Sequence, residues 1–167
     1  KIINSVKNGN ESLTDDDLLK HHRRYGKPII ISTGMSEMKQ IEHAVEVLGT
    51  DDLIILHSTS TYPSQPEELN LNMIKTLKET FSIPVGYSGH EVGLASTFAA
   101  SILGAQVLER HITLDRAMWG SDQAASIEPQ GLKRLLRDIR ELDVTLGDGV
   151  KKVYESEIPI IEKLRRK

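Results

Sequence analysis

His90 and His111 are the histidines whose positions in the sequence best suit a divalent metal ion. Each lies at or near the end of a short apolar run that is typical of a buried strand, and the ends of consecutive parallel strands meet at one edge of a sheet. Two imidazoles that leave other positions to water and substrate oxygen suit Mn²⁺ better than a structural zinc site. The alternative is that each is a hydrogen-bonded structural histidine.

Hydroxyl groups follow other apolar runs of the same kind. Phosphates and carboxylates bind to such hydroxyls and to backbone N–H groups at helix starts, and Gly34 permits a close approach. The sequence therefore predicts an anion site, although serine and threonine at these positions can also simply cap the following helices. The polar stretches are Ser32-Thr33-Gly34, His57-Ser58-Thr59-Ser60-Thr61-Tyr62, Tyr87-Ser88-Gly89-His90 and Glu109-Arg110-His111.

A polar loop around Gly120-Ser121 follows the last predicted strand. It contains Asp122, which can hold a metal-bound water molecule or position a substrate hydroxyl. The alternative for Asp122 is an Asx turn beside a glycine. Trp119 is either a wall of the substrate site or an exposed loop aromatic, and His57 is expected to support its own loop.

The overall composition limits the classes of function. The 167 residues, of which 38% are hydrophobic, suit one globular domain. A formal net charge of -3 provides no excess positive charge for a nucleic-acid backbone. The lack of cysteine excludes disulfides and thiolate metal sites, and no secretory or membrane-spanning segment is recognisable. We therefore expect a cytoplasmic protein that binds neither nucleic acid nor membranes. Because the chain begins with Lys1, we expect it to be part of a longer polypeptide.

Short β-branched runs alternate with segments of helical periodicity along most of the chain, which is typical of a parallel α/β fold. Thr14 and Asp17 form a capping-box pattern for a helix that continues to about Tyr25. With the first and last units included, we expect about five βα units. The predicted strands are 1–3, 28–32, 53–56, 84–88 and 107–114, and the other predicted helices cover about 41–48, 73–81, 94–102 and 129–142.

Two architectures fit this alternation: an open doubly wound sheet, and the later part of a TIM (β/α)₈ barrel. An open sheet would normally carry a Gly-rich nucleotide loop after an early strand, and neither a GxGxxG nor a Walker A pattern is present. The sequence therefore favours a partial barrel. We expect residues 1–142 to form the later part of a barrel domain and residues 143–167 to form its end and a linker.

Several motifs together resemble those of the N-acetylneuraminate (sialic acid) synthases and their relatives for other nonulosonic acids. The resemblance covers nearly the whole chain, and the order of the motifs at predicted strand ends makes it specific. It implies a (β/α)₈ catalytic barrel and a linker toward a small C-terminal antifreeze-like domain. The motifs are Lys27-Pro28-Ile29-Ile30-Ile31-Ser32-Thr33-Gly34-Met35, His57-Ser58-Thr59-Ser60-Thr61-Tyr62-Pro63 with Asn70-Leu71, Gly86-Tyr87-Ser88-Gly89-His90-Glu91, Leu108-Glu109-Arg110-His111-Ile112-Thr113-Leu114-Asp115-Arg116 and Gly120-Ser121-Asp122.

The resemblance implies a transferase that condenses phosphoenolpyruvate with N-acetylmannosamine, or its 6-phosphate, to give a sialic acid and phosphate. It also implies a divalent ion bound by His90 and His111, with Mn²⁺ expected and Mg²⁺ or Co²⁺ as alternatives. Asp122 matches an acidic residue that takes part in catalysis near metal and substrate. The residues that match phosphoenolpyruvate-binding positions are Lys1, Ser32, Ser60, Tyr62 and Ser88.

The sequence departs from the family pattern at two places. Gln123 stands where many relatives have histidine, so one possible polar contact of the family is not assigned here. The stretch that follows Lys1 is longer than is usual in the family. A serine expected just after that lysine is therefore not assignable between Ser5 and Ser12.

Two alternatives to sialic acid synthesis remain. A synthase for legionaminic, pseudaminic or spore-coat sugar acids would share the anion and metal site, although Gly89-His90-Glu91 resembles the N-acetylneuraminate branch more closely. The other alternative is a non-catalytic anion-binding module. Because a closed barrel needs about 250 residues, we expect the chain alone to be inactive. The resemblance implies that the parent enzyme is a homodimer.

Overall fold

The computed structural model describes residues 5–166 of the chain, except the side chain of Asn8. Its strands form one parallel five-stranded sheet, in which the order in space follows the order along the chain. A parallel sheet with this order arises when each strand is followed by a helix that returns the chain to the same edge. The strands are β1 (Val6–Asn8), β2 (Ile29–Ser32), β3 (Leu53–Ser58), β4 (Val85–Gly89) and β5 (Leu108–Arg110).

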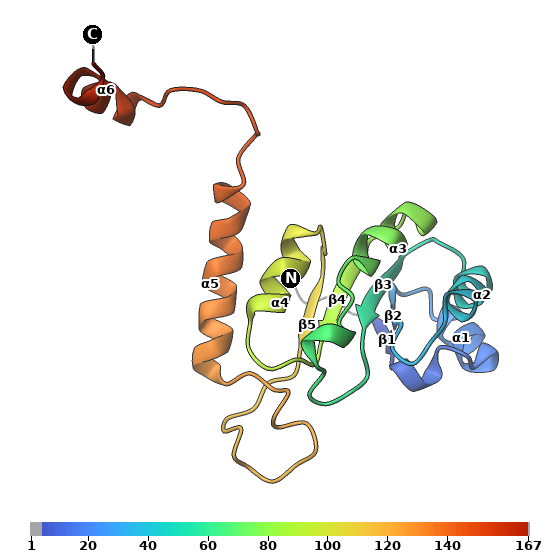
Figure 1. Cartoon of the computed structure of the whole chain (residues 1–167). Coiled ribbons are helices and arrows are strands. Elements are labelled where there is room, and N and C mark those ends of the chain that lie inside the picture. Colours follow the sequence, from blue (N-terminus) through green and yellow to red (C-terminus); the bar gives the residue numbers. More distant parts are fainter. Residues whose placement is uncertain (1–4, 167) are drawn as a thin grey trace.

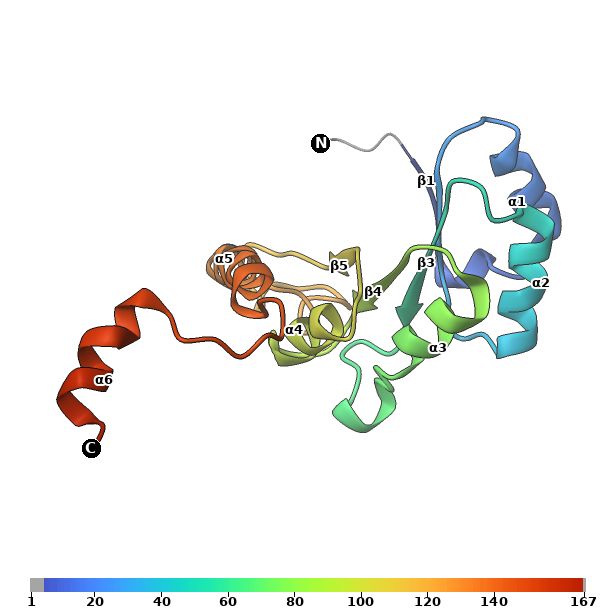
Figure 2. The ribbon, with the colours of Figure 1, turned by 90° about the horizontal axis from the view of Figure 1, so that it is seen from above.

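A helix follows each strand, and the sheet is curled into part of a TIM barrel (Figure 1). Seen from above, the strands follow an arc, and the first four α-helices lie on its outer side (Figure 2). This arrangement confirms the predicted partial barrel. The helices are α1 (Asp16–Arg23), α2 (Met38–Leu48), α3 (Met73–Phe81), α4 (Ala95–Ile102) and α5 (Pro129–Thr145), with short 3₁₀ turns η1 (Asn10–Ser12) and η2 (Pro66–Glu68).

The two faces of the sheet carry different kinds of side chain, because successive residues of a strand point to opposite faces. The outer face is apolar and packs against the helices in one core, which contains Ile31, Ile55, Tyr87 and Leu77 of α3. The inner face is polar near the carboxyl ends of the strands. The register places Ser58 beside Ser88 and Ser88 beside Glu109, and Ser32 and Lys7 lie on the same face.

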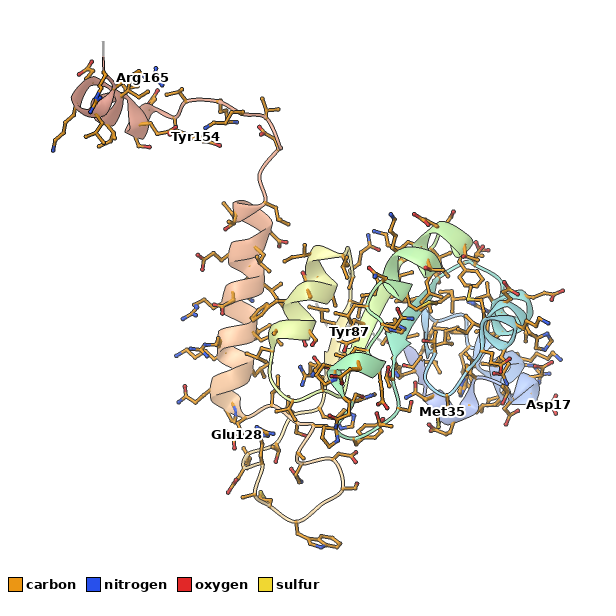
Figure 3. The ribbon with its side chains drawn as sticks, in the orientation of Figure 1. Asp17, Met35, Tyr87, Glu128, Tyr154 and Arg165 are labelled. Carbon is orange, nitrogen blue, oxygen red and sulfur yellow. The ribbon has the colours of Figure 1, made fainter. Side chains whose placement is uncertain are left out.

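The C-terminal part extends away from the barrel. A loop of residues 111–128 precedes α5, and a single bridge between Ile112 and Ile127 closes its base. Beyond α5 the chain runs to the 3₁₀ turn η3 (Glu155–Glu157) and to α6 (Ile158–Leu164), which stands apart from the sheet (Figure 1). Figure 3 shows Tyr154 and Arg165 on this outlying segment. No helix within residues 5–166 is both long enough and apolar enough to cross a membrane.

Local predictions differ from the structure at several points. The strand predicted at 1–3 lies outside the described residues, and the first described strand begins at Val6. The last strand ends at Arg110 rather than at residue 114, because beyond it the chain leaves the sheet and forms the bridge at Ile112. The cap of α1 is Asp15, whose carboxylate accepts a hydrogen bond from the Leu18 N–H at 3.0 Å, instead of Thr14. The division predicted at residue 142 stays a prediction.

Candidate metal and anion site

The ends of β4 and β5 bring His90 and His111 together. Their ring centroids are 5.2 Å apart, and the rings are nearly perpendicular. His90 is buried, whereas about a third of the His111 side chain is exposed. The sequence analysis placed both histidines at strand ends, and the curl of the sheet makes them neighbours.

His90 is oriented through its Nδ1 atom, which lies 2.7 Å from the carbonyl oxygen of Thr59. Because a carbonyl only accepts hydrogen bonds, Nδ1 carries the proton, and Nε2 retains a lone pair for a metal ion. Burial lowers the pKa of His90, against a smaller opposing effect of the Thr59 carbonyl. The neutral imidazole that a metal requires is therefore favoured at this position.

Asp122 lies beside the second histidine, as the polar loop after β5 folds back over the strand ends. Its Oδ2 atom is 3.5 Å from Nδ1 of His111. A carboxylate at Nδ1 favours the tautomer that leaves Nε2 available as a ligand. The structure thus gives each histidine an oxygen partner on Nδ1.

Tyr62 packs against both imidazoles. Its ring centroid is 4.2 Å from that of His90 and 5.5 Å from that of His111. Burial raises the pKa of Tyr62, and the negative charges of Asp122 and Glu11 raise it further. The phenol is therefore held in its protonated form, in which it can donate a hydrogen bond.

A row of polar side chains crosses the inner face of the sheet. Lys7 Nζ donates to Ser32 Oγ at 2.7 Å and lies 3.4 Å from Glu109 Oε1. Ser88 Oγ donates to the same Glu109 oxygen at 2.8 Å. The row joins β1, β2, β4 and β5, and its ammonium group and hydroxyls are the kinds of donor that bind phosphate and carboxylate.

Two further hydroxyls are available at the end of β3. The Oγ atoms of Ser58 and Ser60 are buried and have no hydrogen-bond partner among the described residues. A buried hydroxyl without a partner is costly, and a ligand acceptor would satisfy it. The space beside Gly34 is filled by Ser60 and by Asn10, whose Oδ1 accepts from the Gly34 N–H at 3.2 Å. Gly34 admits these side chains, and the close approach of an anion predicted there stays a prediction.

The remaining predicted residues are placed as follows. His57 Nε2 lies 2.7 Å from the Leu69 carbonyl oxygen, so this histidine supports its loop as predicted. Trp119 is 99% exposed at the tip of the loop before α5 and forms no wall in this structure. Lys1, the lysine expected to meet the anion, lies outside the described residues.

The protein alone supplies an incomplete set of metal ligands. Within residues 5–166, no group of three or more His, Cys, Asp or Glu side chains is arranged to hold a metal ion. His90 and His111 would leave the remaining coordination positions to water and substrate. This open donor set fits the predicted catalytic ion, and it does not fit a closed structural site.

The sequence analysis did not name Lys7, and it named Glu109 only as part of a polar stretch, without a role of its own. Glu109 precedes His111 by two residues, so period-two alternation along the strand was a usable signal for it. Lys7 was harder to find, because the three residues of β1 include no apolar run. Its contact with Ser32 depends on the pairing of β1 with β2.

Comparison with known proteins agrees with this fold. Residues 2–151 match the model of the NeuB family. The chain is 44% identical over 150 residues to the N-acetylneuraminate-9-phosphate synthase of Homo sapiens, a match that covers 87% of this chain and 42% of that protein. It is 41% identical over 159 residues to the N,N'-diacetyllegionaminic acid synthase of Campylobacter jejuni, a match that covers 92% of this chain and 48% of that protein. The chain belongs to the NeuB family.

A solved structure supports the same conclusion. The N-acetylneuraminic acid synthetase of Leptospira borgpetersenii, crystallised with citrate, superposes with a TM-score of 0.84 at 32% identity. The match covers 98% of this chain and 59% of that chain. This chain thus spans less than half the length of the two curated relatives above and little more than half of the Leptospira synthetase.

Proposed function

We propose that this chain carries the metal and anion site of a synthase that joins phosphoenolpyruvate to N-acetylmannosamine or its 6-phosphate. The products are a sialic acid and inorganic phosphate. When the sugar substrate is the 6-phosphate, the sialic acid retains that phosphate group. The observation that carries the proposal is the position of His90 and His111 beside the row of Lys7, Ser32 and Ser88 at one edge of a parallel barrel. Ligands of (β/α)₈ barrels bind at this edge.

The polar row is suited to hold phosphoenolpyruvate. The Lys7 ammonium and the Ser32 hydroxyl lie together at the ends of β1 and β2 and provide donors for the phosphate or the carboxylate. Ser60 and Ser88 add hydroxyls from β3 and β4, and Tyr62 adds a protonated phenol. The Ser88 hydroxyl donates to Glu109 in this structure and would rotate to donate to the substrate, whereas the Ser60 hydroxyl has no partner among the described residues.

The histidine pair is suited to hold a divalent ion, for which we propose Mn²⁺. When bound there, such an ion would supply Lewis-acid polarisation of the aldehyde of the open-chain sugar. The enol carbon of phosphoenolpyruvate forms the new C–C bond with that aldehyde carbon, water adds to the carbon that bears the phosphate, and cleavage of the C–O bond releases phosphate. Asp122, beside His111, is placed to orient a substrate hydroxyl or a water.

Substitutions in the full-length protein test the two halves of this proposal. His90→Ala and His111→Ala are expected to abolish metal-dependent turnover, whereas His43→Ala, on the exposed face of α2, keeps it. Lys7→Met is expected to raise the KM for phosphoenolpyruvate about 10- to 100-fold, since a hydrogen bond to a charged group is worth about 1.5–3 kcal/mol. The matched control Lys75→Met, at an exposed position of α3, leaves this KM unchanged. Normal metal dependence in both histidine variants would contradict the metal site.

Synthesis of another nonulosonic acid is the second candidate, and the relatives named for legionaminic acid favour it as much as the human relative favours sialic acid. Both candidate enzymes would use phosphoenolpyruvate, and they differ in the hexosamine that they accept. A panel of N-acetylmannosamine, its 6-phosphate and diacetylated hexosamines, each assayed with phosphoenolpyruvate and Mn²⁺, separates them. The proposed function predicts the highest kcat/KM with one of the first two sugars, and a preference for a diacetylated sugar would establish the second candidate.

A further inference from the structure

A buried ion pair lies directly behind the histidine pair. Glu91 follows His90, and Arg110 precedes His111. The Arg110 Nη1 atom is 3.1 Å from Glu91 Oε1, and each of these two side chains is only 3% exposed. A charged pair so fully removed from water is rare in proteins and requires further hydrogen bonds to be tolerated.

Neighbouring groups satisfy the carboxylate of Glu91. Oε1 accepts from the Thr97 hydroxyl at 3.0 Å as well as from Arg110, and Oε2 accepts from the Tyr87 hydroxyl at 2.9 Å. Figure 3 shows Tyr87 in the interior, at the centre of the sheet region. Burial and the charge of Glu91 raise the pKa of Tyr87, so its hydroxyl keeps the proton that it donates.

Arg110 connects several backbone segments around the site. Its Nη2 donates to the Glu91 carbonyl oxygen at 2.7 Å and to the Ala125 carbonyl oxygen at 3.3 Å, and its Nη1 donates to the Gly93 carbonyl oxygen at 2.9 Å. One guanidinium therefore ties β5 to the backbone that carries His90 and to the loop that carries Asp122. The planar fork of arginine can make these bonds together, and the single ammonium of lysine cannot.

The pair faces away from the predicted substrate. Arg110 alternates with Glu109 along β5, and Glu109 points to the inner face, where it meets Lys7 and Ser88. Arg110 consequently points to the outer face, toward Thr97 of α4. It can therefore act on the site only indirectly, through the backbone segments that carry His90, His111 and Asp122.

We infer that Glu91 and Arg110 are positioning residues, which set the separation and orientation of His90 and His111 and thereby the affinity for the divalent ion. This inference rests on the proposed metal site. Groups that orient metal ligands without touching the metal typically change affinity by 10–100-fold when replaced. Every residue of β4, which precedes His90, is buried, whereas the residues of β5, which precede His111, are only partly buried. Packing therefore restricts the His111 segment less than the His90 segment, and the ion pair joins the two.

The test is a titration of the metal-free full-length protein with Mn²⁺, followed by the electron paramagnetic resonance signal of free Mn²⁺. Glu91→Gln and Arg110→Lys are expected to raise the Kd for Mn²⁺ by 10–100-fold at a temperature where each variant is folded. Tyr87→Phe keeps the ring and removes one hydrogen bond to Glu91, so a smaller loss in the same direction is expected. The control Leu77→Ala, on the buried side of α3, lowers the melting temperature and leaves this Kd within about twofold.

The outcomes separate the inference from the proposed function. If His90→Ala and His111→Ala weaken Mn²⁺ binding while Glu91→Gln, Arg110→Lys and Tyr87→Phe bind it as tightly as the wild type, the pair is merely structural and the inference is wrong. If Leu77→Ala weakens binding as much as Arg110→Lys, general destabilisation explains the effect, and the inference is again wrong. If neither histidine variant changes the Kd, the metal site itself fails, and the inference fails with it.

Discussion

The middle of the sheet and its last unit differ in how far helices cover them. We call β2–β4 with α2 and α3 the covered region, and β5 with residues 111–128 and α5 the open region. The outer-face residues of the covered strands are fully buried, whereas every residue of β5 is only partly buried. In α5, which has 17 residues, Leu135 is the one buried residue. A groove of about 740 Å³ separates β5 from α5.

The two regions therefore hold their site side chains in place in different ways. In the covered region, close packing restricts each strand and so fixes the residues at its carboxyl end. In the open region, hydrogen bonds and the Glu91–Arg110 ion pair perform this task. The histidine pair spans the border between them, so substitutions in the two regions are expected to have unequal effects.

The largest difference is expected for apolar truncation. Leu77→Ala removes a fully buried side chain of the covered region and should lower the free energy of unfolding by about 2–5 kcal/mol. Val144→Ala, at an 82% exposed position of α5, should change it by less than about 0.5 kcal/mol. Chemical denaturation of both variants measures the difference, and equal losses would show that the two regions are packed alike.

A smaller loss is expected where a methyl group is added inside the sheet. A Cβ at Gly86 would overlap the Val107 carbonyl oxygen and the Leu56 side chain. Gly86→Ala should therefore lower the free energy of unfolding by about 1–3 kcal/mol, because the neighbouring strands must move apart. Unchanged stability in the same denaturation experiment would mean that β4 and β5 separate freely.

A glycine-to-alanine substitution in the open region is expected to raise the free energy of unfolding instead of lowering it. Gly131 lies in the first turn of α5, and the nearest neighbour of a Cβ there, Ile127 Cβ, is at an ordinary contact distance of 3.7 Å. Gly131→Ala should raise the free energy of unfolding by about 0.4–1 kcal/mol, since alanine reduces the freedom of the unfolded chain and favours the helix. A loss of stability would show that α5 is more tightly packed than the structure indicates.

Acidification should act on the covered region through His57. Burial lowers the pKa of this histidine below the ordinary value of 6.5, so the unfolded chain binds its proton more readily than the folded protein. The contribution of His57 to stability is therefore fully present above about pH 6.5 and is lost as the pH falls through the lowered pKa. Melting temperatures between pH 8 and pH 5 should fall less steeply for His57→Gln than for the wild type. An identical slope for both would contradict the burial of His57.

Much of the architecture follows from local sequence patterns. The strands predicted at 28–32, 53–56 and 84–88 are present at 29–32, 53–58 and 85–89. The helical spacing of Ile41, Leu77 and Leu135 places each of these residues in a helix with its apolar side buried. These features depend on residues a few positions apart, so the local sequence is sufficient to indicate them. The same holds for the strand-end location of His90 and His111, because parallel strands present their carboxyl ends at one edge.

The tertiary structure decided which of these residues meet. Nothing local to Lys7 indicates that it reaches Ser32, because that contact depends on the register between β1 and β2. The Glu91–Arg110 pair likewise forms only when β4 and β5 lie side by side with α4 behind them. The identity of the amino acids determined the available chemistry and the period of each element. The distances between side chains far apart in the sequence depended on strand register and on the curl of the sheet, which arise from the packing of the whole domain.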